Sequence, residues 1–159
     1  MLDGPEADAF DAAAMAALRD VPSQTMLTDG IASAYQSGVD TVADTAGVKT
    51  LVPAESPTRA AAPYMARTDG NTYRTTAHLS HEVFGPAGLA VRVASIEEMR
   101  TVASGLDGQL TCTLQIDEDD HAAAATLMPI LERKAGRLLA NGFPTGVEVA
   151  DAMVHGGPY

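Results

Sequence analysis

The chain has 159 residues, a length typical of one domain, and 46% of them are hydrophobic, which is enough to form a packed core. Its 21 acidic and 10 basic residues give a formal net charge of −11, so phosphate backbones and anionic lipids are repelled and neither nucleic acid nor a membrane surface is an expected partner. No apolar run approaches the ~20 residues of a membrane span, and the first six residues do not resemble a signal peptide.

The first predicted element is a helix over residues 5–18. Pro5 suits the first helical position, and Glu6 and Asp8 suit the positive end of the helix dipole. Its apolar residues at helical spacing define the predicted buried face, which consists of Phe10, Ala13, Ala14, Ala17 and Leu18.

A second helix is predicted to begin near Thr28 and to end at Gly47. Its apolar stripe consists of Ile31, Tyr35, Val39 and Val42. Residues 48–52 then predict a strand, and residues 60–66 are expected to be extended. Thr68-Asp69-Gly70-Asn71 has the composition of a turn.

Strand and helix patterns alternate in the second half of the chain. The predicted elements are strand 89–94, a helix capped by Ser95, strand 109–116, a helix capped by Asp117, and strand 137–140. Two successive crossovers of this kind give a mostly parallel sheet covered by helices. We therefore predict a single α/β domain over residues 1–159. No Gly-x-Gly-x-x-Gly opens any helix, so the chain is not itself a Rossmann cofactor domain.

The most informative stretch is His81-Glu82-Val83-Phe84-Gly85-Pro86, which precedes the strand at residue 89. Glu82 and Phe84 are separated by one residue, so their side chains point the same way if the segment is extended. Gly85 and Pro86 then turn the chain. A carboxylate beside an aromatic ring suits a ribose diol next to a flat heterocycle. The alternative interpretation is a solvated acid and a core ring.

A second candidate stretch follows the last predicted strand. Residues 141–158 contain several glycines and prolines together with Phe143 and His155. Ligands of open α/β sheets lie beyond the carboxyl ends of the strands, which is where this loop begins. The alternative is an ordinary C-terminal loop.

These residues carry a family resemblance. Glu82-Val83-Phe84-Gly85-Pro86 resembles the motif with which aldehyde dehydrogenases hold the nicotinamide end of NAD(P), although the family more often has an acid at the position of His81. Residues 131–139 and 141–158 resemble the α-ketoglutaric semialdehyde (2,5-dioxopentanoate) dehydrogenase branch. The resemblance implies a three-layer α/β fold and a C-terminal portion of the catalytic domain. The nucleophilic cysteine, the general base and the Rossmann domain of that family have no match here.

The resemblance also implies roles for individual residues. Glu82 would hold the nicotinamide ribose of NADP or NAD, Phe84 would lie against the nicotinamide ring, and Phe143 and His155 would lie on the substrate side. With no catalytic residue, the chain alone is expected to be inactive and to bind cofactor weakly or not at all. Expected partners are the rest of a dehydrogenase chain or sister subunits in a cytoplasmic homo-oligomer. The alternative function is a non-catalytic interaction module or truncated pseudoenzyme.

The remaining reactive side chains do not predict a site. Cys112 lies on the apolar face of a predicted strand, so we interpret it as a core residue, and a single cysteine fits a reducing cytosol. His78 and His81 are three residues apart, but no third ligand with zinc spacing accompanies them. No metal site is predicted.

Overall fold

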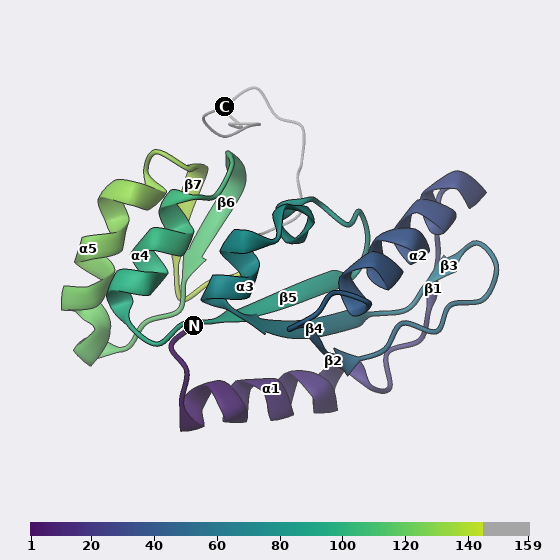
Figure 1. Cartoon of the computed structure of the whole chain (residues 1–159), viewed down its shortest axis with the longest axis horizontal. Helices are drawn as coiled ribbons and strands as arrows, with labels where there is room; N and C mark the ends of the chain where they lie inside the picture. Colours follow the sequence, from purple (N-terminus) through teal and green to yellow (C-terminus); the bar gives the residue numbers. More distant parts are fainter. Residues whose placement is uncertain (145–159) are drawn as a thin grey trace. The chain divides into compact units, whose positions relative to one another are not determined.

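A computed structural model describes residues 1–144 as two compact units, Met1–Ser95 (the N-terminal unit) and the part of Ile96–Tyr159 up to residue 144 (the C-terminal unit). Each mixes helices and strands, so the predicted α/β class is confirmed (Figure 1). The prediction of a single domain over residues 1–159 stays a prediction. No helix among residues 1–144 is long and apolar enough to cross a membrane.

The N-terminal unit contains three α-helices, a 3₁₀ helix and five strands in its described residues. In chain order they are α1 (Pro5–Leu18), β1 (Gln24–Thr25), α2 (Asp29–Ala43), β2 (Lys49–Val52), β3 (Ala60–Ala61), β4 (Tyr64–Asp69), α3 (Gly70–Thr75), η1 (Ala77–Ser80) and β5 (Ala87–Arg92). The two long helices and the strands at β2 and β5 therefore form close to where the sequence predicts them.

Strand β4 is the centre of the three-stranded sheet β2-β4-β5. It is antiparallel to β2 and parallel to β5. In the parallel pair, Tyr64 lies opposite Ala87 and Asp69 lies opposite Arg92. The first residues of the chain lie beside the end of β5, since Leu2 forms a parallel bridge with Val93. A separate antiparallel pair joins β1 and β3.

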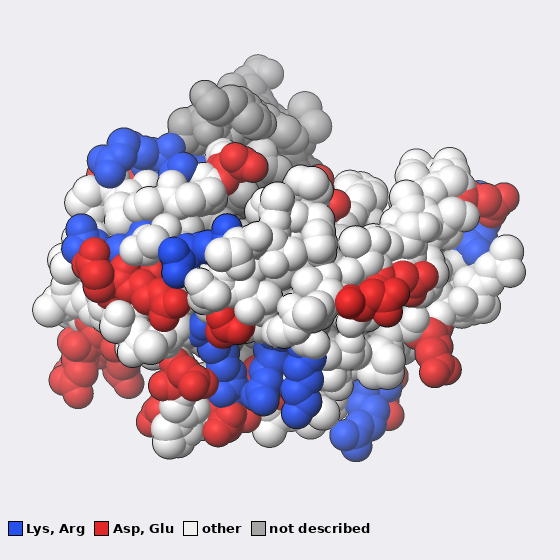
Figure 2. Space-filling model, viewed as in Figure 1, with Lys and Arg blue, Asp and Glu red and all other residues white. Residues whose placement is uncertain are grey.

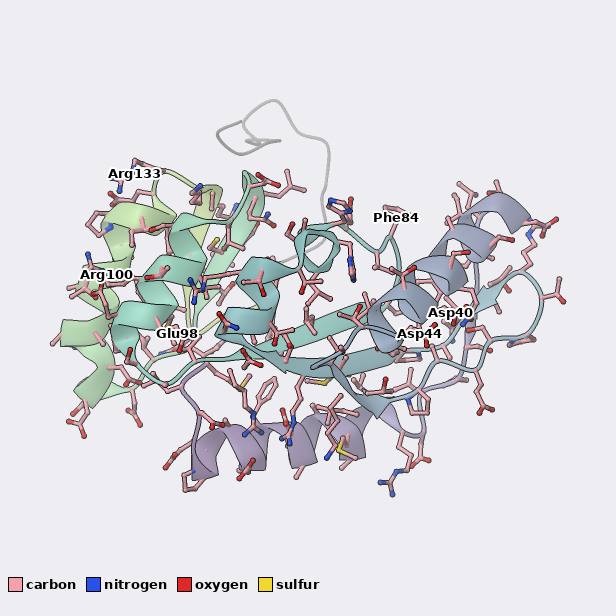
Figure 3. All side chains as sticks on the ribbon, in the orientation of Figure 1. Asp40, Asp44, Phe84, Glu98, Arg100 and Arg133 are labelled. Carbon is pink, nitrogen blue, oxygen red and sulfur yellow. The ribbon has the colours of Figure 1, made fainter. Side chains whose placement is uncertain are left out.

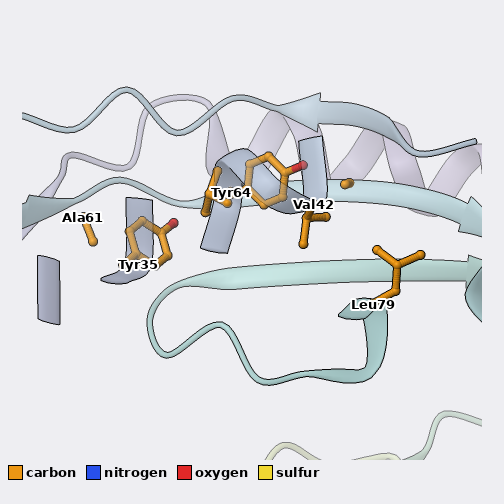
Figure 4. Packing of buried hydrophobic residues seen from close by; sticks show 7 residues of the cluster. Tyr35, Val42, Ala61, Tyr64 and Leu79 are labelled. Carbon is orange, nitrogen blue, oxygen red and sulfur yellow. The ribbon is translucent and has the colours of Figure 1, made fainter. Parts of the chain in front are cut away.

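The two faces of this sheet carry different helices. Tyr64 and Ala66 of β4 pack in one core with Tyr35, Val39 and Val42 of α2. Met65, which points to the other face, packs with Val52, Ala90 and the α1 residues Ala14, Met15 and Leu18. Figure 4 shows the first core, with the ring of Tyr35 beside Ala61 and the ring of Tyr64 beside Val42. A strand buried on both faces is expected at the centre of a covered sheet.

The predicted buried face of α1 is correct in part, because Ala14 and Leu18 pack against the sheet whereas Phe10, Ala13 and Ala17 are exposed. Phe10 is 49% exposed, whereas Ala7 and Asp11 are buried. Asp11 is drawn inward because its carboxylate accepts hydrogen bonds from Arg92 at 2.6 Å and from Arg67 at 3.1 Å. Burial of a charge is tolerated when the charge is paired in this way.

The pair between Asp11 and Arg92 belongs to a larger ion cluster under the sheet. Arg92 also donates to Asp3 and Asp8, at 2.8 Å each. The bond from Arg92 lowers the pKa of Asp3, and the bonds to Asp3 and Asp8 raise the pKa of Arg92. Figure 2 shows acidic and basic side chains interleaved along α1, at the bottom of the view. The cluster fixes α1 to β4 and β5.

The predicted turn at residues 68–71 is also wrong. Strand β4 continues to Asp69, and α3 begins at the next residue. The Asp69 carboxylate accepts from the backbone N–H of Thr72 at 2.9 Å and from its hydroxyl at 2.8 Å. Asp before Gly is typical of turns, but the same side chain is also a strong helix N-cap, and the tertiary context selects the cap.

The C-terminal unit consists of α4 (Ile96–Ser104), β6 (Gln109–Leu114), η2 (Glu118–Asp120), α5 (His121–Leu131) and β7 (Ala135–Ala140) in its described residues. Strands β6 and β7 pair in parallel across α5, as the sequence predicts, and Leu127, Ile130 and Leu131 are buried. Among the described strands, β5 pairs with β4 in the sheet of the N-terminal unit, and β6 and β7 form a second parallel pair in the C-terminal unit.

We predict that Asp11→Asn lowers the free energy of unfolding by about 1–3 kcal/mol, because it removes the charge that two guanidinium groups share. This loss of stability is smaller than for an isolated buried ion pair, because Arg92 still forms ion pairs with Asp3 and Asp8. Urea unfolding at pH 7 measures it. Asp20→Asn, at an exposed position after α1, is the control and should change stability by less than about 0.5 kcal/mol. Equal effects of the two substitutions would contradict a role of the cluster in stability.

Candidate functional site

The candidate site is the loop of residues 81–86, which leads from η1 into β5. Glu82 is exposed and Phe84 is 66% exposed, while Val83 between them is half-buried. Figure 3 labels Phe84 on this loop. The alternation places the carboxylate and the ring on the solvent side and the valine on the protein side. The structure therefore leaves both predicted cofactor residues accessible to a ligand.

Helix α2 supports the loop from beneath, first through Tyr35. The Tyr35 side chain is 1% exposed, and its hydroxyl donates to the carbonyl oxygen of Ala62 at 2.6 Å. Burial raises the pKa of Tyr35, so the hydroxyl stays protonated and remains a donor at neutral pH. The same hydroxyl lies 3.4 Å from the carbonyl oxygen of Pro86. Tyr35 thus contacts both the segment before β4 and the end of the loop.

Position 85 requires glycine, because its backbone lies directly against the ring of Tyr35. Its φ is +152°, and a Cβ at this position would lie 2.4 Å from Cδ2 of Tyr35. No side chain fits at that distance, and L-residues rarely adopt that backbone conformation. The turn that the sequence predicts at Gly85 is therefore a close approach of the loop to α2.

A cavity of about 750 Å³ lies between α2, η1 and the loop. It is mostly apolar, and its lining combines the loop with core residues, namely Met26, Val39, Val42, Tyr64, Leu79, His81, Glu82, Val83, Phe84, Gly85, Pro86, Ala87, Gly88 and Leu89. The volume lies in the range of small-molecule sites, which are typically about 300–1,000 Å³. An aromatic ring and a carboxylate at the rim of an apolar hollow suit a ligand with a flat ring and a polar diol.

His78, in the helix η1 that precedes the loop, contacts the residues that follow the C-terminus of α2. Its Nε2 lies 2.7 Å from the hydroxyl oxygen of Thr45, just beyond the helix C-terminus. His81, three residues on, is exposed. Among the described residues, no group of three His, Cys, Asp or Glu side chains has metal-binding geometry.

Phe143, one of the two predicted substrate residues, lies in the C-terminal unit. Phe143 is 89% exposed and follows a turn at Asn141, whose φ is +52°. The Asn141 side chain accepts from the backbone N–H of Ile116 and donates to its carbonyl oxygen, so it links the ends of β6 and β7. The assignment of Phe143 to a substrate site stays a prediction. His155 lies outside the described residues.

Cys112 packs against the core of the C-terminal unit, as predicted. It contacts the cluster formed by Ala103, Leu127, Ile130 and Leu131, and it is partly buried. Burial raises the pKa of its thiol, which lowers the fraction of nucleophilic thiolate at neutral pH. These properties are typical of a structural cysteine.

Sequence reasoning missed how α2 supports the loop. The predicted apolar stripe of the helix includes Tyr35, but the contact of its ring with Gly85 joins residues 50 apart in the chain. Gly38, in the middle of α2, is a signal that could have found this support. A glycine in the middle of a helix is less favourable than alanine, so it is a position to test for a close approach by another segment.

Two curated relatives match almost the whole chain. Alpha-ketoglutaric semialdehyde dehydrogenase 2 of Azospirillum brasilense is 48% identical over 165 residues, which cover 99% of this chain and 30% of the relative. Alpha-ketoglutaric semialdehyde dehydrogenase of Acinetobacter baylyi is 38% identical over 164 residues, covering 99% of this chain and 31% of the relative. The chain thus spans about 30% of the length of these relatives. No family model matches it.

Solved structures show the same fold. A lactaldehyde dehydrogenase structure aligns with a TM-score of 0.71 at 15% identity, covering 91% of this chain and 32% of that one. An NAD-dependent benzaldehyde dehydrogenase from Corynebacterium glutamicum aligns with a TM-score of 0.67 at 17% identity, covering 86% and 30%. The fold is that of an aldehyde dehydrogenase catalytic-domain segment. The identity to the curated relatives over nearly the whole chain supports its place as a segment of the aldehyde dehydrogenase superfamily, and the solved structures show the fold alone.

We predict that Cys112 reacts slowly with a disulfide reagent such as 5,5′-dithiobis(2-nitrobenzoate) at pH 8. The rate should be roughly tenfold or more below that of glutathione, because the thiol is partly buried and its pKa is raised. Addition of denaturing urea should restore the full rate. A native rate equal to or above that of glutathione would show that Cys112 is an activated nucleophile rather than a core residue.

Proposed function

We propose that this chain supplies the nicotinamide-side wall of the active site in an NAD(P)-dependent aldehyde dehydrogenase. The observation that carries the proposal is the arrangement of Glu82 and Phe84, which share the accessible side of a loop anchored on α2. The similarity to α-ketoglutaric semialdehyde dehydrogenases supports a semialdehyde as the substrate. The reaction would be its oxidation to the carboxylate.

In this proposal Glu82 accepts hydrogen bonds from the two nicotinamide ribose hydroxyls. A carboxylate has free acceptor sites on both oxygens, so it can bind both hydroxyls at once. Phe84 covers one side of the nicotinamide ring, which limits its rotation and excludes water. The nicotinamide, when bound, accepts the hydride of the aldehyde. The C. glutamicum structural neighbour is an NAD-dependent enzyme, which supports this cofactor at the level of the family.

The nucleophile and general base of the reaction would come from outside residues 1–159. Cys112 does not supply the nucleophile, because it packs in a core and its thiol pKa is raised. We infer that the chain alone is inactive and binds NAD(P) weakly or not at all. Phe143 and His155 are proposed to lie on the substrate side in the complete enzyme.

Exposed apolar side chains support a role for further polypeptide around this chain. Leu27 is 80% exposed and Phe143 is 89% exposed, and Leu110 on β6 is also exposed. Exposed apolar side chains are typical of surfaces that pack against a partner when they form a contiguous patch. We propose that the rest of a dehydrogenase chain or sister subunits cover them. The cytosol is the proposed location, because the single cysteine does not require an oxidising compartment.

The same exposure is compatible with a second function, a non-catalytic interaction module. Such a module would use the apolar surfaces and would place no demand on Glu82. A chimera separates the two. In it, residues 1–159 replace the matching 30% of the A. brasilense relative. Aldehyde-dependent reduction of NAD(P)⁺ by this chimera supports the dehydrogenase, and a folded chimera without activity supports the module.

We predict that Glu82→Gln in the chimera weakens cofactor binding or hydride transfer by about 1–2 kcal/mol, or roughly five- to thirtyfold. Glutamine keeps the shape but removes the charge that strengthens the ribose hydrogen bonds. Rapid-mixing kinetics separate hydride transfer from the attack of the cysteine, which should change little. Glu55→Gln, at another loop acid, is the matched control. An unchanged cofactor dissociation constant together with an unchanged hydride-transfer rate would contradict the assignment of Glu82.

A further inference from the structure

Helix α2 makes a second close contact with the loop, three residues after Tyr35. Gly38 faces Val83, and a Cβ on Gly38 would lie 3.0 Å from Cγ1 and 3.2 Å from Cγ2 of that valine. Contacts this short are tighter than most real Cβ contacts. The missing side chain at position 38 therefore provides the space that Val83 occupies.

Val83 lies between the two proposed cofactor residues along the chain. Because it packs inward against the core that contains Tyr35, its neighbours on both sides project outward. A displacement of Val83 away from α2 would move the backbone of Glu82 and Phe84 with it. The contact at Gly38 thus lies directly beneath the proposed site but does not touch a cofactor.

We propose that Gly38 is a positioning residue, whose lack of a side chain sets how closely the Glu82–Pro86 loop approaches α2 and thereby where Glu82 and Phe84 present themselves to the cofactor. The inference rests on the proposed function of these two residues. Its physical basis is geometric. Hydrogen bonds to ribose hydroxyls and ring contacts need placement within a few tenths of an ångström, and a displacement of about 1 Å can cost roughly a hundredfold in rate.

Helix stability argues for a positional reason for this glycine. Glycine in a helix interior is less favourable than alanine, so the sequence loses helix stability at position 38. Gly30, in the first turn of the same helix, offers an internal comparison. A Cβ there would meet only the Thr28 hydroxyl oxygen, at an ordinary 3.8 Å. Alanine therefore fits at position 30 without disturbing the loop.

The first experiment uses the 159-residue chain. Gly38→Ala and Gly30→Ala are compared with the unaltered chain by urea unfolding and by amide ¹H–¹⁵N NMR spectra. We expect both variants to remain folded. The loop amides from Glu82 to Gly85 should shift in Gly38→Ala and stay in place in Gly30→Ala. Loop resonances in Gly38→Ala that match those of the unaltered chain would overturn the inference.

The second experiment measures the cofactor in the chimera described above. Gly38→Ala should weaken NAD(P)⁺ binding or hydride transfer by roughly three- to tenfold, as expected for a shift of a few tenths of an ångström. Gly30→Ala should leave both unchanged. The double variant Gly38→Ala/Val83→Ala removes the two valine methyl groups that the introduced methyl group meets, so it should recover at least part of the loss relative to Gly38→Ala. If Gly38→Ala caused only a general packing defect, the double variant would instead lose more cofactor binding or hydride transfer than Gly38→Ala, because the defect of Val83→Ala would add to it.

The two proposals fail in different ways. If Glu82→Gln changes neither cofactor binding nor hydride transfer, the proposed function is wrong, whatever the effect of Gly38→Ala. If Glu82→Gln weakens cofactor binding or hydride transfer but Gly38→Ala behaves like Gly30→Ala in both experiments, the loop is functional and the inference about Gly38 is wrong. A loop shift without any change in cofactor binding or hydride transfer also overturns the positioning role.

Discussion

The arrangement of the candidate site depends on the contact between the ring of Tyr35 and Gly85. The ring occupies the volume that any side chain at residue 85 would need, and the Tyr35 hydroxyl is held by the carbonyl oxygen of Ala62. One buried side chain of α2 therefore links the segment before β4 to the loop before β5. Since β4 and β5 pair in parallel from Tyr64 and Ala87 onward, the end of the loop is held at a fixed point of the sheet.

This constraint explains why the motif has its particular residue types. Val83 and Gly85 face α2, where one fills the space beside Gly38 and the other lies on an aromatic ring. Glu82 and Phe84 are the positions left free to face solvent. The apolar contacts therefore fix the loop and the two exposed side chains are available for a ligand. A rigid support of this kind is what a binding loop needs, because preorganised groups lose less entropy when the ligand binds.

Much of the local structure could be predicted from sequence, because it depends on neighbours in the chain. The helix over Pro5–Leu18, the Thr28 cap and the parallel pair around α5 follow from capping residues and apolar spacing. Asp11 could not be predicted as buried, since its partners Arg67 and Arg92 lie on strands more than 50 residues away. The contacts of α2 with the loop also join segments that are far apart in the chain. The motif itself indicates the two exposed residues of the loop, but nothing in its spacing indicates what holds them in place.

Binding of the nicotinamide ribose by Glu82 is the central claim, and a crystal structure of the chimeric dehydrogenase with bound NAD(P)⁺ tests it directly. We expect both ribose hydroxyls within about 2.5–3.0 Å of the Glu82 carboxylate oxygens, with Phe84 against the nicotinamide ring. A structure in which the ribose hydroxyls bind other residues and Glu82 faces solvent would contradict this role.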